Sequence, residues 1–539
     1  MSSIVIIGGG HNALVAAFYL AKAGHRPLVL ERRETVGGGA ITEELHPGFR
    51  CPTLAHHVGP LWTEIVRDME LARHGVEFLV PGTQVFAPGL DGRVLMLYDD
   101  VGRSAEAIRK LSAKDAAAYP AYRESIARIT EVLASLFATS PPRIDDPTAG
   151  DLWNMLRAGR KFRALGRKDG YRLLRWSPMA VADLVHEWFE SELLCATLAA
   201  PGVSGTMFGP RSAGSALVLM MREAHQRLGD HASRVRGGPG ALTQGMARAA
   251  TAAGATIRTR AEVERVVVTN GRVTGVALAG GEQVDTRAVV SAVDPKTTFL
   301  RLVDPIDLTP DFLTKVGNYR SAGTVAKVNL ALSALPRFSG LGANDMGSLS
   351  GRIHLGPEID YLERAFDHAK YGEFSSEPWL DITIPSILDP QLAPAGAHVM
   401  SIYAHYAPAT LRGTTWDASQ ETFGNAVLQT LARYAPGIEQ LVVAGQVITP
   451  AELDTKYGFF GGHVYHGELA LDQLLTMRPL LGFGQYRSPI DGLYLCSAGT
   501  HPGGFMTGGS GRNAAREILK DLPRTQAGSL DPAEQQWRN

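Results

Sequence analysis

Residues 4–31 read IVIIGGGHNALVAAFYLAKAGHRPLVLE, and this stretch decides the fold. The apolar run 4–7 predicts a short buried parallel strand, since β-branched residues fill it and glycines follow at once. Apolar residues at helical spacing after the glycines predict a helix that ends near Gly24. Residues 27–30 predict a second strand, which ends at Glu31. The stretch therefore predicts one βαβ unit that begins an α/β domain.

The glycines of this unit match a dinucleotide-binding fingerprint. Gly8, Gly10 and Ala13 occupy the GxGxxG/A positions, which serve a tight turn, close approach to a pyrophosphate and close helix packing. The following helix would direct free N–H groups and the positive end of its dipole at the phosphates. Glu31 stands where a carboxylate can accept hydrogen bonds from a ribose diol. The combination predicts a bound dinucleotide.

NAD and FAD share this fingerprint, so two further features are needed to choose between them. The stretch RRETVGGGAIT, residues 32–42, adds a second glycine turn at Gly37 and Gly38. Near the other end of the chain, DGLYLCSAGTHPGG, residues 491–504, is a strand pattern that runs into a glycine loop. A second turn suits the longer cofactor, and the cofactor we expect is FAD.

Taken together, these motifs resemble the phytoene desaturase-related FAD-dependent oxidoreductases. The resemblance also includes GGPGAL at 237–242 and VVSAVDP at 289–295, and it extends over nearly the whole chain. The stretch HGELALDQLLTMRPL at 466–480 favours a subgroup that includes the desaturase-like carotene ketolases. The resemblance implies oxidation (desaturation) of an apolar small-molecule substrate, isoprenoid or carotenoid-like, by removal of hydrogen from carbon. Two alternatives stay open: an amine oxidase-like flavoenzyme, and an FAD-bound assembly or interaction protein.

The same resemblance implies cofactor contacts from several parts of the chain. The expected cofactor-binding residues are Gly8, Gly10, Asn12, Ala13, Glu31, Arg32, Gly37, Gly38, Thr42, Val263, Gly499, Thr500, Gly503, Gly504, Met506 and Thr507. His501, in the C-terminal glycine loop, is a weak candidate for a flavin or substrate contact. No catalytic base is assigned.

The predicted fold class is α/β, with a discontinuous Rossmann-like FAD-binding domain and a mixed α+β substrate domain that carries a helical cap. We expect residues 1–104, 237–299 and 485–525 to form the FAD-binding domain, and 105–236 and 300–484 to form the substrate domain with its cap. Residues 526–539 are expected to be a polar tail. Asn270-Gly271 predicts a hairpin turn, and Ser112 with Asp115 predicts a capping box.

Composition excludes several other functions. The chain has 539 residues, and 53 Lys and Arg balance 54 acidic residues, so no overall field favours nucleic acid. Cys51, Cys195 and Cys496 form no CxxC cluster, which argues against a zinc or dithiol site. A segment at His463, His466 and Glu468 lacks a known metal-ligand spacing, and no metal is expected.

The sequence favours a cytoplasmic location, because it shows neither a basic leader segment nor the ~18 uninterrupted apolar residues of a membrane span. Residues 152–176 carry eight Lys or Arg and one acid, Asp169. Apolar residues share one face of this segment, which suggests an interfacial helix for anionic lipid; a charged, solvated surface is the alternative. These apolar residues are Leu152, Met155, Leu156, Phe162 and Leu165. The oligomeric state is not predicted.

Overall fold

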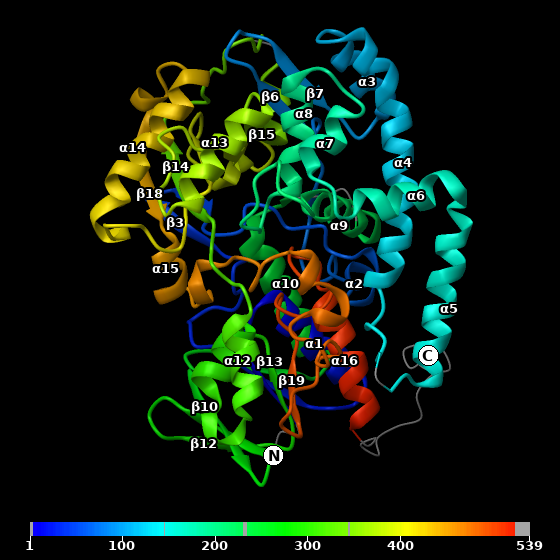
Figure 1. The fold of residues 1–539 in the computed structure, drawn as a ribbon. Coiled ribbons are helices and arrows are strands. Elements are labelled where there is room, and N and C mark those ends of the chain that lie inside the picture. Colours follow the sequence, from blue (N-terminus) through cyan, green and yellow to red (C-terminus); the bar gives the residue numbers. More distant parts are fainter. Residues whose placement is uncertain (1–3, 145, 230–233, 343–344, 523–539) are drawn as a thin grey trace.

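The computed structural model describes residues 4–144, 146–229, 234–342 and 345–522, and the predicted polar tail lies outside them. Its first layer is a five-stranded parallel sheet (Figure 1). The strand order is β19 (Leu493–Leu495), β13 (Val289–Ser291), β1 (Ile4–Ile7), β2 (Pro27–Leu30) and β9 (Thr256–Arg258). The predicted strands at 4–7 and 27–30 and the C-terminal strand thus meet in one sheet.

Alternation along β1 explains how this sheet is covered on both faces. Ile4 and Ile6 belong to the cluster that includes helix residues of α1 (His11–Lys22), α10 (Gly238–Ala252) and α16 (Gly509–Asp521). Val5 and Ile7 instead pack with the three-stranded antiparallel sheet of β10 (Val263–Thr269), β11 (Arg272–Leu278) and β12 (Gln283–Asp285), and with α12 (Pro310–Asn318). A strand buried on both faces reads as a continuous apolar run. The predicted turn at Asn270-Gly271 joins β10 to β11, and both residues have positive φ.

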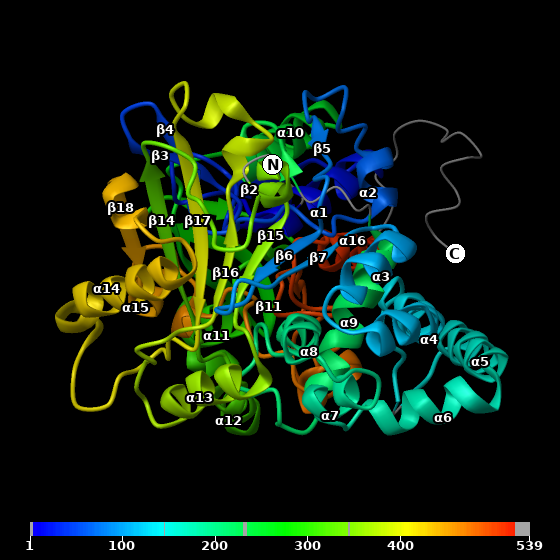
Figure 2. The ribbon, with the colours of Figure 1, turned by 90° about the horizontal axis from the view of Figure 1, so that it is seen from above.

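A seven-stranded sheet forms the second layer (Figure 2). Its order is β18 (Val442–Ile448), β14 (Val325–Leu332), β17 (His398–His405), β16 (Leu380–Thr383), β15 (Arg352–Leu355), β6 (Val85–Pro88) and β7 (Val94–Leu97). Neighbouring strands are antiparallel except β15 and β6. Its apolar face packs against α14 (Trp416–Tyr434).

The opposite face of this sheet is polar although it is buried. In β14, Ala326, Val328 and Leu330 enter the apolar cluster, while Lys327 and Asn329 between them point to the other side. The same alternation recurs in β15, β16 and β17. The buried polar or aromatic residues there are Arg352, His354, Asp381, Thr383, Ser401, Tyr403 and His405.

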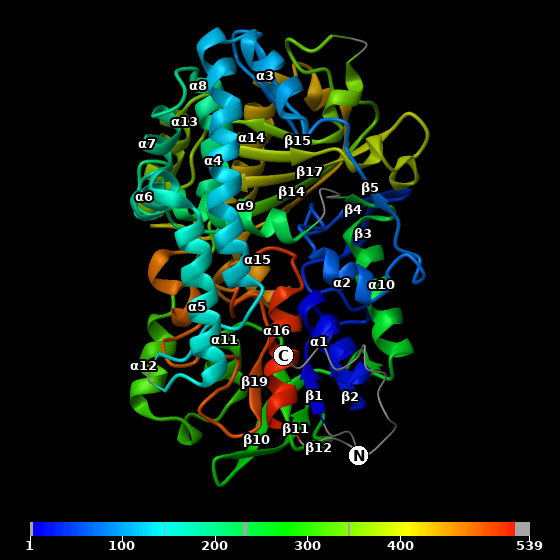
Figure 3. The ribbon, with the colours of Figure 1, turned by 90° about the vertical axis from the view of Figure 1, so that its right-hand side faces the viewer.

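Helices from residues 101 to 228 form the predicted cap on one side of the molecule (Figures 2 and 3). They are α3 (Val101–Arg109), α4 (Ala113–Phe137), α5 (Ala149–Ala164), α6 (Gly166–Trp176), α7 (Val181–His186), α8 (Glu192–Ala199) and α9 (Ser215–Leu228). The remaining elements are α2 (Thr63–Asp68), α11 (Pro295–Thr297), α13 (Ile359–Lys370), α15 (Pro450–Thr455), the hairpin β3 (Thr42–His46) with β4 (Phe49–Pro52), and the pair β5 (Phe78–Leu79) with β8 (Arg234–Val235).

Three expectations need correction. Strands β6 and β7 were expected in the FAD-binding segment 1–104, yet they pair with β15 of the second sheet. The basic segment 152–176 is not one helix, because α5 ends at Ala164 and α6 begins at Gly166. Ser112 caps α4 as predicted, but the Asp115 carboxylate accepts N–H groups of residues 190 and 191 and does not close a capping box. The other predicted domain boundaries stay predictions.

Among the described residues, no helix is both long and apolar enough to span a bilayer.

Candidate functional site

One cavity of about 690 Å³ joins the two layers. Its wall includes the first glycine turn and the end of β2 on one side, and Tyr403 of β17 and Arg222 of α9 on the other. Nine of the predicted cofactor-binding residues line it: Gly8, Gly10, Asn12, Ala13, Glu31, Arg32, Gly38, Val263 and Met506. Residues from distant parts of the sequence therefore meet in one site, as the fingerprint predicts.

The turn after β1 is held from both sides. The Gly8 N–H donates to the Leu30 carbonyl at 2.8 Å, and its φ of 91° suits glycine. The Glu31 carboxylate accepts the N–H groups of Gly9 at 2.7 Å and Arg33 at 2.9 Å. A Cβ on Gly9 would stand 2.8 Å from Val36 Cγ1, so the third glycine of the run is as constrained as the two in the fingerprint.

The second glycine turn packs on the first. Gly10 and Gly37 form a parallel β-bridge, and the Gly37 N–H donates to the Gly9 carbonyl at 2.9 Å. Arg33 Nη2 donates to the Gly38 carbonyl at 2.6 Å. Gly37 itself stands behind the wall, where it supports Gly38. Gly9 and Arg33 line the cavity too; sequence reasoning missed both.

The start of α1 fits a dinucleotide pyrophosphate. No side chain among the described residues caps this helix, and its first turn carries no acid. The first N–H groups of a helix need acceptors, and the helix dipole favours a negative charge there. His11, in the same turn, is buried, which lowers its imidazole pKa to about 4 and keeps it neutral. The turn thus offers an anion N–H donors without a competing carboxylate.

The C-terminal loop contributes less to the wall than expected. Met506 and its neighbour Phe505 line the cavity, but the other predicted loop residues and Thr42 do not; these are Gly499, Thr500, Gly503, Gly504 and Thr507. Thr500 Oγ1 donates to the Ser497 carbonyl at 2.8 Å, and Thr42 Oγ1 accepts the Gly240 N–H at 3.0 Å. Their predicted cofactor contacts stay predictions.

His501 is also behind the wall. It is fully buried, and its ring lies edge-on to Phe137 with 6.0 Å between centroids. Burial lowers its imidazole pKa to about 4. The segment His463–Glu468 does not converge as a ligand set either, because Glu468 accepts from Arg320 Nε at 2.8 Å and His463 Nδ1 accepts two backbone N–H groups.

The substrate end of the cavity was not found from the sequence. It is lined by His57, Arg222, Tyr403, Tyr465 and Phe505. The signal was present in the alternation of polar residues along otherwise apolar strands, as in VAKVNLAL and HVMSIYAH. Register then assembles the polar face, because Lys327 pairs with Tyr403 and Asn329 with Ser401. Burial lowers the Lys327 pKa to about 8.

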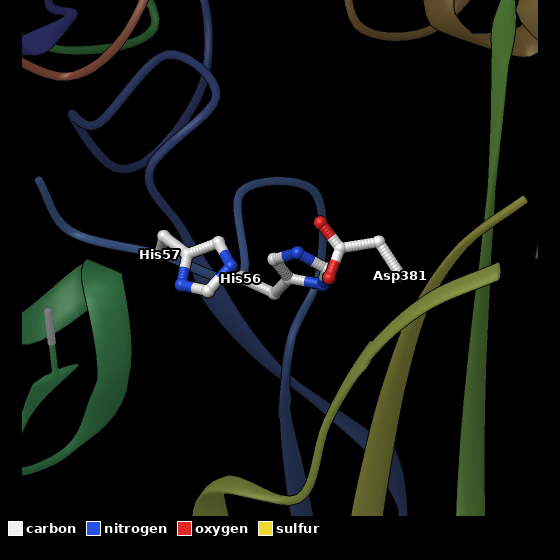
Figure 4. Close-up of side chains that lie close together, drawn as sticks. All are labelled: His56, His57 and Asp381. Atoms are coloured by element: carbon white, nitrogen blue, oxygen red, sulfur yellow. The ribbon is translucent and has the colours of Figure 1, made fainter. Parts of the chain in front are cut away.

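His56, His57 and Asp381 meet beside this end of the cavity (Figure 4). One potential ligand atom from each lies within 4.8 Å of the others. However, His57 Nδ1 lies 2.7 Å from Arg234 Nη1, and a guanidinium can only donate, so this nitrogen is an acceptor already in use. Arg352 stands 3.7 Å from Asp381, and Arg222 and Arg234 also act on its carboxyl pKa. A divalent cation would meet these guanidiniums, and we do not assign a metal.

Two glycine turns against the end of a parallel strand, with a cavity that continues to a second sheet, define an FAD-dependent oxidoreductase. The chain belongs to the family of flavin containing amine oxidoreductases, which matches residues 14–519. This membership confirms the predicted fold class and FAD as the cofactor.

Individual relatives refine the placement. Pyridine nucleotide-disulfide oxidoreductase domain-containing protein 2 of Rattus norvegicus is 38% identical over 96% of this chain and 93% of its own length. A phytoene desaturase (neurosporene-forming) of Cereibacter sphaeroides is 26% identical over 98% of this chain and 96% of its own. The fold is similar to that of cyclohexylamine oxidase from Brevibacterium oxydans, with a TM-score of 0.58, 16% identity and coverage of 96% and 99%. The resemblance to phytoene desaturase-related flavoproteins is confirmed.

Proposed function

We propose that this protein dehydrogenates an organic substrate with an apolar, isoprenoid-like body by removing hydrogen from carbon. The observation that carries the proposal is the continuity of the cavity, because one wall joins Gly8 and Glu31 to Tyr403 and Phe505. Bound FAD would supply the electron acceptor. The chain's own task is to hold the substrate against the cofactor and to exclude water.

The walls of the cavity suit such a substrate. Between the two ends lie Leu54, Phe459 and Val464, which offer apolar contact. Histidines on the wall are poor bases, since burial lowers the pKa of His11 and of His466 to about 4. Weak bases favour a reaction in which hydrogen leaves carbon with its electron pair; the neighbouring carbon then loses a proton that needs only a weak acceptor. The phytoene desaturase relative supports this substrate class.

An amine oxidase-like reaction is less well supported. The Arg222 guanidinium lies on the cavity wall at the substrate end, where it would repel an ammonium group. The solved amine oxidases share the fold at 16% identity or less, which carries no substrate.

Anaerobic mixing of the FAD-loaded protein with candidate substrates tests the proposal. Isoprenoid compounds should bleach the visible absorbance of the flavin, and primary amines of equal length should not. Mass spectrometry of lipid-soluble compounds that copurify would identify the natural substrate class. Bleaching by amines alone would overturn the proposal, and a protein that no compound reduces would favour a binding or assembly role.

We further propose that α5 docks on anionic lipid. Four large apolar side chains, Leu152, Trp153, Met155 and Leu156, are more than half exposed on this helix. Basic residues follow on the same helix at Arg157, Arg160, Lys161 and Arg163. Exposed apolar groups beside cations suit the boundary between acyl chains and anionic headgroups. In Figure 1 the two helices α5 and α6 stand at the outer edge of the cap. An apolar substrate would then reach the protein from the bilayer.

A further inference from the structure

Arg222 is a cation on the cavity wall that lacks an acidic partner. It projects from α9, and its guanidinium carbon lies 5.5 Å from the centre of the Phe505 ring. Among the described residues, it has no carboxylate oxygen within 4.0 Å. The adjacent Glu223 pairs with Arg123 instead, at 3.3 Å. A partly buried charge without a counter-ion costs free energy, which a ligand of opposite charge would recover.

The groups around Arg222 do not neutralise it. His57 lies on the same wall, and burial together with the Arg234 and Arg222 guanidiniums holds its pKa well below the usual value, so it is neutral. Burial raises the pKa of Tyr465, which keeps its phenol neutral as well. The nearby Asp381 carboxyl is shared by three guanidiniums, with Arg352 the nearest at 3.7 Å. The substrate end therefore has a positive potential.

Acids elsewhere on the cavity wall have partners of their own. Each belongs to the dinucleotide end and lies within 4 Å of an arginine there, apart from Glu264: the pairs are Glu31 with Arg33, Glu262 with Arg32, and Asp454 with Arg301. The pyrophosphate of the cofactor, in turn, has the N–H groups of α1. Neither the protein acids nor the cofactor phosphates account for Arg222.

We propose that Arg222 binds a carboxylate group of the substrate, so that the substrate is an organic acid with an apolar body. The proposal rests on the proposed function and specifies its substrate class. The planar fork of a guanidinium matches the two oxygens of a carboxylate, which gives orientation as well as affinity. Tyr465 and Tyr403 stand on the same wall, where their phenol groups can donate to the same oxygens. The carboxylate end would thus fix which carbon faces the flavin.

Equilibrium titration of the FAD-loaded protein tests this subsite without turnover. Octanoate, octanol and octylamine are matched in length and differ in the charged group, and binding is followed by the change in flavin absorbance and by thermal shift. Octanoate should bind at least about tenfold more tightly than octanol, because a charge-assisted hydrogen bond is lost in the alcohol. Octylamine should bind more weakly than either.

Variants assign the preference to one residue. Arg222→Gln should remove the preference for octanoate, and Arg222→Lys should retain part of it. Arg227→Gln is the matched control, since Arg227 is exposed on the same helix, and it should change nothing. Equal binding of the three probes by the wild-type protein would overturn the proposal.

Two more readouts separate the remaining explanations. If Arg222→Gln left octanoate binding intact but shifted the reduction potential of the flavin, Arg222 would serve the cofactor, and the carboxylate subsite would be wrong. A clear octanoate preference in a protein that no substrate reduces would support the subsite while contradicting the proposed dehydrogenation. The two proposals can therefore fail independently.

Discussion

Glu31 accepts a hydrogen bond of 2.7 Å from the Gly9 N–H, which ties the end of β2 to the glycine turn after β1. Its second oxygen accepts the Arg33 N–H at 2.9 Å. One carboxylate thus holds the first turn and the start of the second, and it lines the cavity as well. Glu31 shapes the backbone that receives the cofactor in addition to facing the expected ribose.

Glu31→Ala should therefore weaken FAD binding by at least about tenfold, since charge-assisted hydrogen bonds contribute about 1.5 to 3 kcal/mol each. Titration of the apoprotein with FAD measures the change. Glu34→Ala is the control, because Glu34 is exposed in the same loop and pairs only with the exposed Arg260. Equal FAD affinity in both variants would show that the turn holds its shape without Glu31.

Gly503→Ala should lower the stability of the fold, a different effect from simple crowding of a flavin. A Cβ at this position would lie 2.6 Å from Nε of Arg478, a fully buried side chain that donates to several carbonyls, among them those of Glu468 and Ala498. Overpacking of this kind costs about 1 to 3 kcal/mol. Gly482→Ala is the control, since Gly482 has nearly the same φ but open space around its Cβ. Denaturant unfolding of both variants gives the difference; a Gly503→Ala protein as stable as Gly482→Ala would contradict the prediction.

Stability should fall as the pH drops below about 6.5. Burial lowers the imidazole pKa of His225 to about 3 and that of His501 to about 4, while both titrate near 6.5 in the unfolded chain. Between these values the unfolded chain binds more protons than the folded one, so the free energy of unfolding decreases with falling pH and levels off below the folded pKa values. The unfolding midpoint in urea, measured from pH 7 to pH 4, records the decline.

His225→Phe should make that decline shallower. The imidazole already stacks on Phe137 with 4.7 Å between centroids, and a phenyl ring can take its place without a titratable group. His368→Phe, at an exposed position on α13, should leave the slope unchanged. An identical slope in His225→Phe and wild type would mean that other groups carry the acid sensitivity.

Trp153→Asp combined with Leu156→Asp should abolish binding to vesicles of anionic lipid. The two side chains are 56% and 55% exposed, and burial of such apolar area in a bilayer interface contributes about 25 cal/mol per Å². Vesicle flotation at low and high salt measures binding, which should also weaken with salt because the basic residues contribute. Ile306→Asp, an exposed apolar position in another part of the chain, serves as the control. If wild type fails to float with vesicles, α5 is a solvated surface.

Short-range pattern was enough to predict the cofactor half. In residues 4–31, strand, turn, helix and acid follow one another, and each step depends on neighbours in sequence: an apolar run, a glycine with positive φ, a helical repeat. The C-terminal strand and its helix were predictable for the same reason. The boundary after residue 84 was not, because β6 and β7 join a sheet whose other strands come much later in the chain.

The substrate half depends on contacts that no local pattern specifies. Lys327 faces Tyr403, and Tyr403 faces Asp381, only because β14, β17 and β16 pair in this register. Arg222 reaches the same cavity from a helix of the cap. The sequence by itself determined a dinucleotide turn, since backbone conformation and burial there follow from adjacent residues. Only the tertiary structure decided that a buried polar sheet face and an unpaired guanidinium meet at the far end of one cavity, because strand register and cap packing are set by distant parts of the chain.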